Sequence, residues 1–143
     1  MKKSLKAPLL LVCLGLFAAQ AFAARPDAAL TPGELCTPDD ADFAGYRYPA
    51  HVAYCKRNVT YAEKQAVAKA YGVPESEWRN YEFDHLIPLN AGGDSHPANI
   101  WPQPLNEAKE KDKVELLTYE GLRDGTLSQE QAVQMIWDWV ADH

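Results

Sequence analysis

The segment Tyr81–Pro104, with the sequence YEFDHLIPLNAGGDSHPANIWPQP, constrains the fold more than any other part of the chain. Two short apolar runs, YEFDHLIPL and NIWPQP, flank the loop NAGGDSHPA. Short apolar runs bounded by glycine and proline are typical of strands, and the glycines of the loop allow positive φ values. The segment therefore predicts a two-stranded hairpin with a long loop.

Helical patterns lie on both sides of this hairpin. Thr60 and Glu63 have the spacing of a capping box, and the helix that follows them is predicted to stop at Gly72. A charged helix is predicted from Asn106 onward, with Gly125 at or just past its end. We expect its inner face to carry Ala108, Val114 and Leu117.

The last helix is predicted from a second capping box, Ser128 with Gln131. Apolar residues then recur at helical spacing: Ala132, Val133, Ile136, Trp139 and Val140. The order strand, loop, strand, helix, with helices on either side, predicts an α+β fold with a hairpin backed by a helix.

The first 23 residues have the pattern of a signal peptide. Three lysines precede an apolar run, and the small residues of Ala21-Phe22-Ala23 suit a cleavage site. A membrane anchor is the alternative, but it needs about 20 apolar residues, and this run is shorter. We expect export to the periplasm or the medium, no stable membrane anchor after cleavage, and one domain over residues 24–143.

Two cysteines, Cys36 and Cys55, remain after the predicted cleavage. An even pair in an exported protein favours one disulfide, which would contribute on the order of 3 kcal/mol. Residues 24–45 are rich in proline, aspartate and alanine, and we expect an extended arm that the disulfide holds. A zinc site lacks further ligands at suitable spacing, and a thiol oxidoreductase would need a CxxC pair.

The charge of the chain argues against long-range attraction to nucleic acid. The chain has 14 basic and 20 acidic residues. Removing Lys2, Lys3 and Lys6 with the signal peptide leaves 11 basic residues and a net charge of −9. Proteins that coat nucleic acid are usually basic. A nucleic-acid partner would have to be bound locally, by a few basic residues or through a metal ion.

Asp84 and His85 are the strongest candidates for chemistry. Adjacent strand residues point to opposite faces unless the backbone is distorted, and Pro88 and the loop make distortion plausible. Hydrolysis of a phosphodiester requires a base, which suits His85, and a hard cation, which suits Asp84 as a ligand. The structural alternative is that Asp84 accepts backbone hydrogen bonds and that His85 is an ordinary strand histidine.

The stretch DHLIPLNAGGDSHPANIWPQPLNEAKEKDKVE resembles the ββα-metal motif of HNH endonucleases. It resembles more narrowly the small exported HNH-like proteins with the pattern DHxIPL, GG, NxWPQP and AKxKDxxE. The similarity covers Tyr81–Glu115, and the segment from LCTP to YCKRN also resembles what precedes the motif in that group. It implies a small ββα-metal core with flanking helices and a disulfide-tied N-terminal arm.

The resemblance implies a role for each motif residue. Asp84 would be a metal ligand, His85 the general base, and Asn99 the residue whose hydrogen bonds brace the loop and orient His85. The helix carries no histidine, so Asn106 is expected as the second metal ligand. Lys109 falls where some relatives place histidine, but a protonated lysine cannot bind a cation. The expected ion is Mg²⁺, with Mn²⁺, Zn²⁺ or Ni²⁺ as alternatives.

Lys109, Lys113 and His96 are candidates for contact with the substrate. Lys109 and Lys113 share one helix face, with Glu110 and Asp112 beside them, and other basic groups nearby are Lys56, Arg57 and Lys111. The alternative is that these lysines form a solvated helix face and that His96 is a solvated loop residue.

These observations favour an exported, divalent-metal-dependent HNH-type endonuclease. Its expected substrate is DNA, or RNA, cleaved with little sequence specificity, because nothing beyond the motif has the pattern of a base-reading module. The alternative is a non-catalytic exported ββα-scaffold domain that binds a protein or surface partner. The net charge and the missing helix histidine support that alternative.

Overall fold

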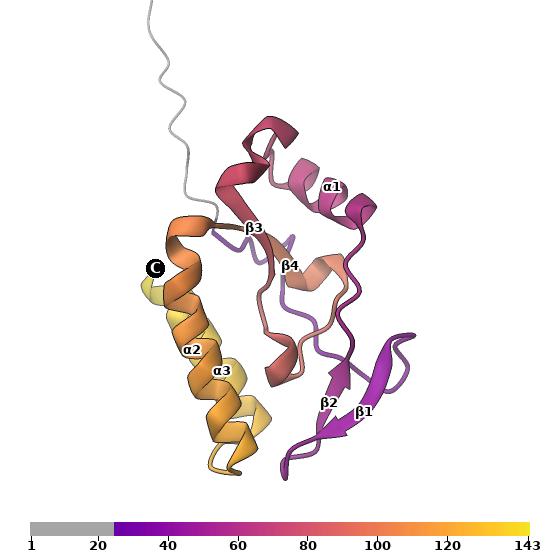
Figure 1. The fold of residues 1–143 in the computed structure, drawn as a ribbon, viewed down its shortest axis with the longest axis vertical. Coiled ribbons are helices and arrows are strands. Elements are labelled where there is room, and N and C mark those ends of the chain that lie inside the picture. Colours follow the sequence, from indigo (N-terminus) through magenta and orange to yellow (C-terminus); the bar gives the residue numbers. More distant parts are fainter. Residues whose placement is uncertain (1–24) are drawn as a thin grey trace, which may run out of the picture.

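The computed structural model describes residues 25–143 (Figure 1). The predicted signal peptide, residues 1–23, lies outside the described residues. Among the helices that are described, none combines the length and the apolar character needed to cross a membrane.

The described chain is an α+β fold with two small antiparallel hairpins and three α-helices. In chain order the elements are β1 (Phe43–Arg47), β2 (Val52–Cys55), α1 (Tyr61–Ala70), η1 (Glu75–Asn80), β3 (Tyr81–His85), η2 (Leu89–Ala91), η3 (Pro97–Asn99), β4 (Ile100–Pro104), α2 (Leu105–Arg123) and α3 (Gln129–Asp142), where η denotes a short 3₁₀ helix. Helices α2 and α3 lie side by side on one side of the β3–β4 hairpin, and α1 lies on the other (Figure 1).

The β3–β4 hairpin has the predicted strands, but β3 is shorter than its apolar run. Tyr81 pairs with Pro104 and His85 pairs with Ile100. The chain leaves the ladder after His85, while Leu86 and Ile87 remain buried in the two hydrophobic clusters. The apolar character of this run reflects burial beyond the strand, so the predicted strand was too long.

Helix α2 begins at Leu105, and Gly125 lies just past its end, close to the prediction. Its inner face agrees with the predicted one in part: Ala108 is half-buried, and Val114 packs against a hydrophobic cluster that contains Leu86. The buried residues of α2 are Lys111, Thr118 and Leu122, whereas Leu117 is 55% exposed. Hydropathy places a lysine outside, but here the ammonium of Lys111 has charged and polar partners inside the fold.

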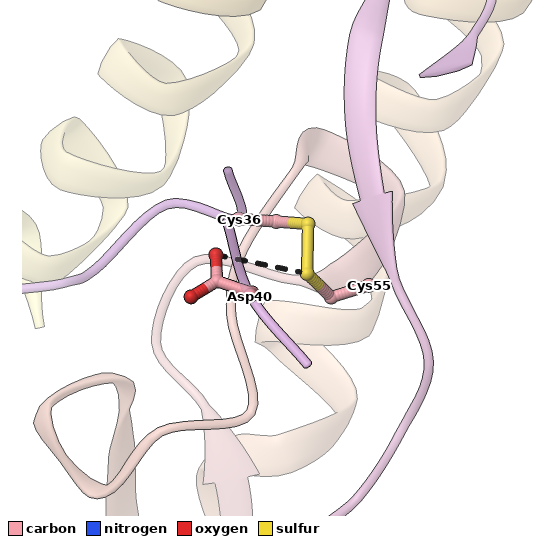
Figure 2. Close-up of side chains that lie close together, drawn as sticks. All are labelled: Cys36, Asp40 and Cys55. Carbon is pink, nitrogen blue, oxygen red and sulfur yellow. Dashed lines mark hydrogen bonds between the residues drawn. A yellow bond between two sulfur atoms is a disulfide. The ribbon is translucent and has the colours of Figure 1, made fainter. Parts of the chain in front are cut away.

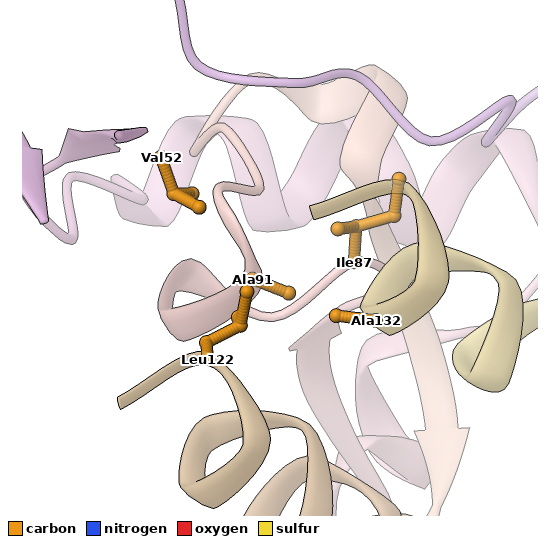
Figure 3. Close-up of a cluster of buried hydrophobic side chains, with 5 residues drawn as sticks. All are labelled: Val52, Ile87, Ala91, Leu122 and Ala132. Atoms are coloured by element: carbon orange, nitrogen blue, oxygen red, sulfur yellow. The ribbon is translucent and has the colours of Figure 1, made fainter. Parts of the chain in front are cut away.

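Two hydrophobic clusters join the hairpins to the C-terminal helices. One consists of Val52, Ile87, Ala91, Leu122 and Ala132, and it links β2, the β3–β4 loop, α2 and α3 (Figure 3). The other consists of Leu86, Trp101, Ile136 and Trp139. The predicted apolar face of α3 supplies Ala132, Ile136 and Trp139 to these clusters, which hold the end of β3 rigidly against α2 and α3.

The described part of the predicted arm, residues 25–42, contains no helix or regular strand, as expected, but the chain that follows forms a hairpin that was not predicted. Residues 43–55 form the β1–β2 hairpin, with a register irregularity between Phe43 and Tyr46. This irregularity interrupts the alternation of apolar and polar residues from which a strand is predicted. Tyr48 and His51 adopt positive φ in the turn. The short stretch between α1 and β3 contains the 3₁₀ helix η1.

The predicted Cys36–Cys55 disulfide is present and ties the N-terminal segment to the end of β2 (Figure 2). Asp40 Oδ2 lies 4.0 Å from Cys55 Sγ. A disulfide sulfur has no hydrogen to donate, so this approach is a packing contact. Among the described residues, these three form the one group of at least three His, Cys, Asp or Glu side chains close enough to share an ion. The disulfide uses both sulfurs and leaves no thiolate to bind a metal.

Candidate functional site

The end of β3 sends its two titratable side chains in opposite directions. Asp84 contacts Lys111 of α2, whereas His85 contacts Ser95 of the β3–β4 loop. This is the alternation expected of a regular strand. The base and the metal ligand proposed from the sequence therefore lie on different faces of β3.

His85 is buried, with 1% of its surface exposed. Its Nε2 lies 3.2 Å from Ser95 Oγ, which also donates to the Lys56 carbonyl. A serine hydroxyl has one proton, so donation to Lys56 fits the tautomer of His85 with its proton on Nε2. Nδ1 is then the free acceptor, and it has no hydrogen-bond partner among the described residues.

Burial, reinforced by the positive charge of Arg57, lowers the pKa of His85 to about 4. The imidazole is therefore neutral at pH 7, the state that a base requires. Its low pKa makes it a weak proton acceptor, and its burial keeps solvent away from it.

The ammonium of Lys111 lies between β3 and α2. It donates to Asp84 Oδ2 at 2.6 Å, to the main-chain oxygen of His85 at 2.7 Å, and to Glu115 Oε1 one turn along α2. These contacts use all three donors of the ammonium. Only 1% of Lys111 is exposed, so the ion pair with Asp84 is shielded from solvent.

Opposing effects act on the charge of Lys111. Burial lowers its pKa, but the carboxylates of Asp84 and Glu115 outweigh burial, and the net shift is upward. Lys111 is therefore an ammonium at neutral pH. Burial raises the pKa of Glu115, an effect that Lys111 opposes.

We call the three oxygens around the ammonium the Lys111 cradle: Asp84 Oδ2, the main-chain oxygen of His85, and Glu115 Oε1. Carboxylate and carbonyl oxygens are the donors that Mg²⁺ and Mn²⁺ accept in proteins. The donor set thus suits a hard cation. In this structure the positive charge at its centre belongs to the chain itself.

Asn99 connects the two ends of the β3–β4 loop. Its Oδ1 accepts from the Ile87 amide at 2.9 Å, and its Nδ2 donates to the carbonyls of Ile87 and Asp94 at 2.9 and 2.8 Å. Its main-chain oxygen accepts from Leu86 at 2.8 Å. These bonds fix the backbone immediately after His85. Through the His85 carbonyl they also help to position the Lys111 cradle.

Gly93 allows this close packing of the loop. A Cβ added to Gly93 would lie 1.8 Å from the main-chain oxygen of Ile87 and 2.8 Å from Asn99 Nδ2. Both distances are far below van der Waals contact. The second glycine of the predicted Gly-Gly loop is therefore required by space.

The other predicted site residues are not gathered around Asp84. Asn106 is exposed and lies five residues before Lys111, which at 3.6 residues per turn is about 140° around the helix. Glu107 lies one turn before Lys111 and is on the same face of α2 as Lys111, whereas Asn106 is not. The geometry of α2 therefore gives no support to Asn106 as a ligand beside Asp84.

The predicted substrate-binding residues lie at the surface. Lys109 is exposed. Lys113 pairs with Glu110 at 2.8 Å, and His96 Nδ1 lies 2.9 Å from Glu34 Oε2. The exposed Lys113–Glu110 ion pair is readily exchanged for other partners. His96 Nδ1 also accepts a hydrogen bond from the Ala98 amide at the start of η3. These three residues are accessible to a ligand, but within residues 25–143 they make no hydrogen bond or ion pair with Asp84 or His85.

Lys111, Glu115 and Ser95 are the site residues that the sequence analysis missed. Lys111 was considered only as one of several basic groups near the motif. The spacing of residues 111, 115, 118 and 122 is that of a single helix face, and two of these positions are the buried Thr118 and Leu122. That spacing was the available signal that Lys111 points inward.

Comparisons with known proteins give no further assignment: no protein-family model, curated protein or solved structure matches the chain.

Proposed function

We propose that the chain is an exported HNH-type phosphodiester hydrolase that acts on DNA, or RNA. One observation carries the proposal: in the order β3, loop, β4, α2, the Asp84–His85 pair ends β3, Asn99 braces the loop, and Asp84 faces α2. The sequence motif leads to the same residues. Export is part of the proposal, and the disulfide suits an oxidising compartment.

A divalent ion, Mg²⁺ or Mn²⁺, would be held by Asp84, and the oxygens of the Lys111 cradle have the right chemistry for it. When bound, such an ion neutralises charge on the phosphate and on the leaving oxygen. Asn106 is not needed for this arrangement. Asp84, the His85 carbonyl and Glu115 are the three oxygen donors that already converge.

His85 would accept the proton of the attacking water. Its Nε2 is fixed by Ser95, so Nδ1 is the atom available to take the proton. Nδ1 is buried, and His85 and Asp84 point to opposite faces of β3. The proposed step therefore requires the loop to open and the end of β3 to turn, so that water near Asp84 can reach Nδ1. Asn99 contributes by holding the backbone that carries His85.

The nucleic acid would be held by local contacts. Lys109, Lys113 and His96 are exposed and could pair with phosphates, which attract lysine without regard to sequence. The acidic chain offers little long-range attraction. Binding should therefore be weak and should fall as salt increases.

The second candidate is a non-catalytic exported domain that binds a protein or surface partner. Two observations favour it: the Lys111 ammonium fills the position where a metal would be needed, and His85 is 1% exposed.

A plasmid-nicking assay separates the two candidates. Disulfide-bonded protein is incubated with supercoiled DNA, and in parallel with RNA, in Mg²⁺, Mn²⁺ or EDTA. The proposal predicts metal-dependent cleavage that is lost in His85→Ala and in Asp84→Asn. His51→Asn, in the exposed turn of the other hairpin, is the matched control and should cleave like the wild type. Absence of cleavage by folded wild-type protein under every condition would sink the hydrolase proposal.

A further inference from the structure

The Lys111 cradle holds a cation that the chain itself supplies. Three oxygens from β3 and α2 converge on one ammonium, at 2.6 Å for Asp84 Oδ2 and 2.7 Å for the His85 carbonyl, with Glu115 as the third. This is more than a surface ion pair. One partner is a main-chain carbonyl at the end of β3, and its position is fixed by the strand and by the loop that Asn99 braces.

The ammonium also leaves the cradle oxygens little room for another ion. Lys111 is 1% exposed, and the side chains of Asp84 and Glu115 are 14% and 24% exposed. Two cations sharing these oxygens would repel each other across a few ångströms, in surroundings of low dielectric constant. An ion can bind to Asp84 only if the ammonium moves away or is removed.

We propose that Lys111 is a built-in competitor for the divalent ion, whose ammonium occupies the cation position formed by Asp84, the His85 carbonyl and Glu115. The inference rests on the proposed function in one respect, the assignment of Asp84 as a metal ligand. The inference adds that the wild-type protein binds the divalent ion weakly, because the Lys111 ammonium occupies the position of the ion.

The test measures Mn²⁺ binding directly. Free Mn²⁺ is followed by electron paramagnetic resonance during titration of the disulfide-bonded protein, and the melting temperature is recorded with and without Mn²⁺. Lys111→Met removes the charge while keeping a long unbranched side chain. Lys69→Met, at an exposed position on α1, removes one lysine charge elsewhere and is the matched control.

A second variant guards against misfolding. Lys111→Met leaves two carboxylates without their cation, whereas Lys111→Met combined with Glu115→Gln leaves Asp84 alone. The wild-type cradle, with Asp84, Glu115 and the Lys111 ammonium, has a net charge of −1. In the double variant Asp84 alone gives the same net charge, so the local charge balance is unchanged. The amide introduced by Glu115→Gln still offers an oxygen.

The expected result is Mn²⁺ binding at least about tenfold tighter in either Lys111 variant than in the wild type, a factor that corresponds to about 1.4 kcal/mol. The variants should also gain a Mn²⁺-dependent rise in melting temperature. Adding Asp84→Asn should abolish both gains, and Lys69→Met should behave like the wild type.

The inference is overturned if folded Lys111 variants bind Mn²⁺ no more tightly than the wild type, or if the gain survives Asp84→Asn. Its failure is distinguishable from failure of the hydrolase proposal. If Mn²⁺ binding rises as expected while no form of the protein cleaves DNA or RNA, the competitor stands and the hydrolase fails. If wild-type protein cleaves with Mg²⁺ but Lys111→Met does not improve ion binding, the hydrolase proposal stands and the competitor proposal fails.

Discussion

The two hairpins of this protein are held together by different means. In the β1–β2 hairpin Tyr46 is 53% exposed and Arg47 lies 3.2 Å from the ring centre of Tyr54, while the Cys36–Cys55 disulfide fixes the base. In the β3–β4 hairpin every residue of β4 is buried, and the buried polar groups Asn99 and Lys111 make the connections. The first hairpin, which has fewer buried side chains, is held by a covalent bond. The second is joined by buried polar groups, Asn99 and Lys111, whose hydrogen-bonding atoms have partners.

This difference bears on where we propose the site. A buried ion pair is weak evidence for stability, because an apolar pair of similar size is often as stable or more so. The Lys111–Asp84 pair is therefore not explained by stability alone. Our hypothesis is that the β3–β4 hairpin preserves a cation position, whereas the β1–β2 hairpin has only to hold its shape.

Gly93→Ala should have the largest effect on stability. A Cβ at this position would overlap the Ile87 carbonyl, and we expect a loss of about 4 kcal/mol or more. Gly45→Ala in the first hairpin meets no atom within 4 Å and is strained only by its φ of 103°, which should cost about 1–2 kcal/mol. Urea unfolding measures both. Equal effects would contradict the contrast between the hairpins.

Lys111→Met should come next, with a loss of about 3–4 kcal/mol, because it leaves Asp84 without its cation. A double-mutant cycle with Asp84→Asn should recover part of that loss, since the two residues contact each other. Urea unfolding gives the free energy of unfolding of the wild type, of each single variant and of the double variant. A loss below about 1 kcal/mol for Lys111→Met would mean that the pair is not shielded from water as described.

Replacing both cysteines, Cys36→Ser with Cys55→Ser, should lower the free energy of unfolding by about 3 kcal/mol, the loop-closure value for this separation. The loss should be accompanied by faster amide exchange in residues 36–55, with protection of β3 and β4 retained. Hydrogen exchange read by mass spectrometry reports both regions. Equal loss of protection in the two hairpins would show that they are not held independently.

Asn99→Ala should lower stability by about 2 kcal/mol, because the buried amide and carbonyl of Ile87 lose their partner. It should also disturb the environment of His85, seen as a shift and broadening of its imidazole resonances. Asn90→Ala, which removes one bond to the Glu115 carbonyl, should have a smaller effect. An unchanged His85 spectrum in Asn99→Ala would argue against a positioning role.

The parts of the fold with local signals could be predicted from the sequence. The capping boxes of α1 and α3 involve residues three apart, and both are present with their reciprocal hydrogen bonds. The β3–β4 hairpin followed from two apolar runs and a glycine loop. The β1–β2 hairpin was missed because its register irregularity and positive-φ turn break the alternation on which strand prediction depends.

The site itself was only partly accessible to such reasoning. The Asp84–His85 pair and Asn99 are visible in the motif. The burial of Lys111 depends on Asp84, which lies 27 residues away in the sequence, and no local pattern contains that pairing. Hydropathy assigns a lysine to solvent, so the predicted inner face of α2 included the exposed Leu117 and left out Lys111. The prediction of Asn106 as a ligand did not take its position around the helix into account.

A crystal structure of the Lys111→Met, Glu115→Gln variant grown in Mn²⁺ would test the central claim most directly, because the anomalous signal locates the ion. We predict a Mn²⁺ peak bound to Asp84 and to the main-chain oxygen of His85, where the ammonium lies in the wild type. A folded variant in which Asp84 binds no Mn²⁺ would contradict the account.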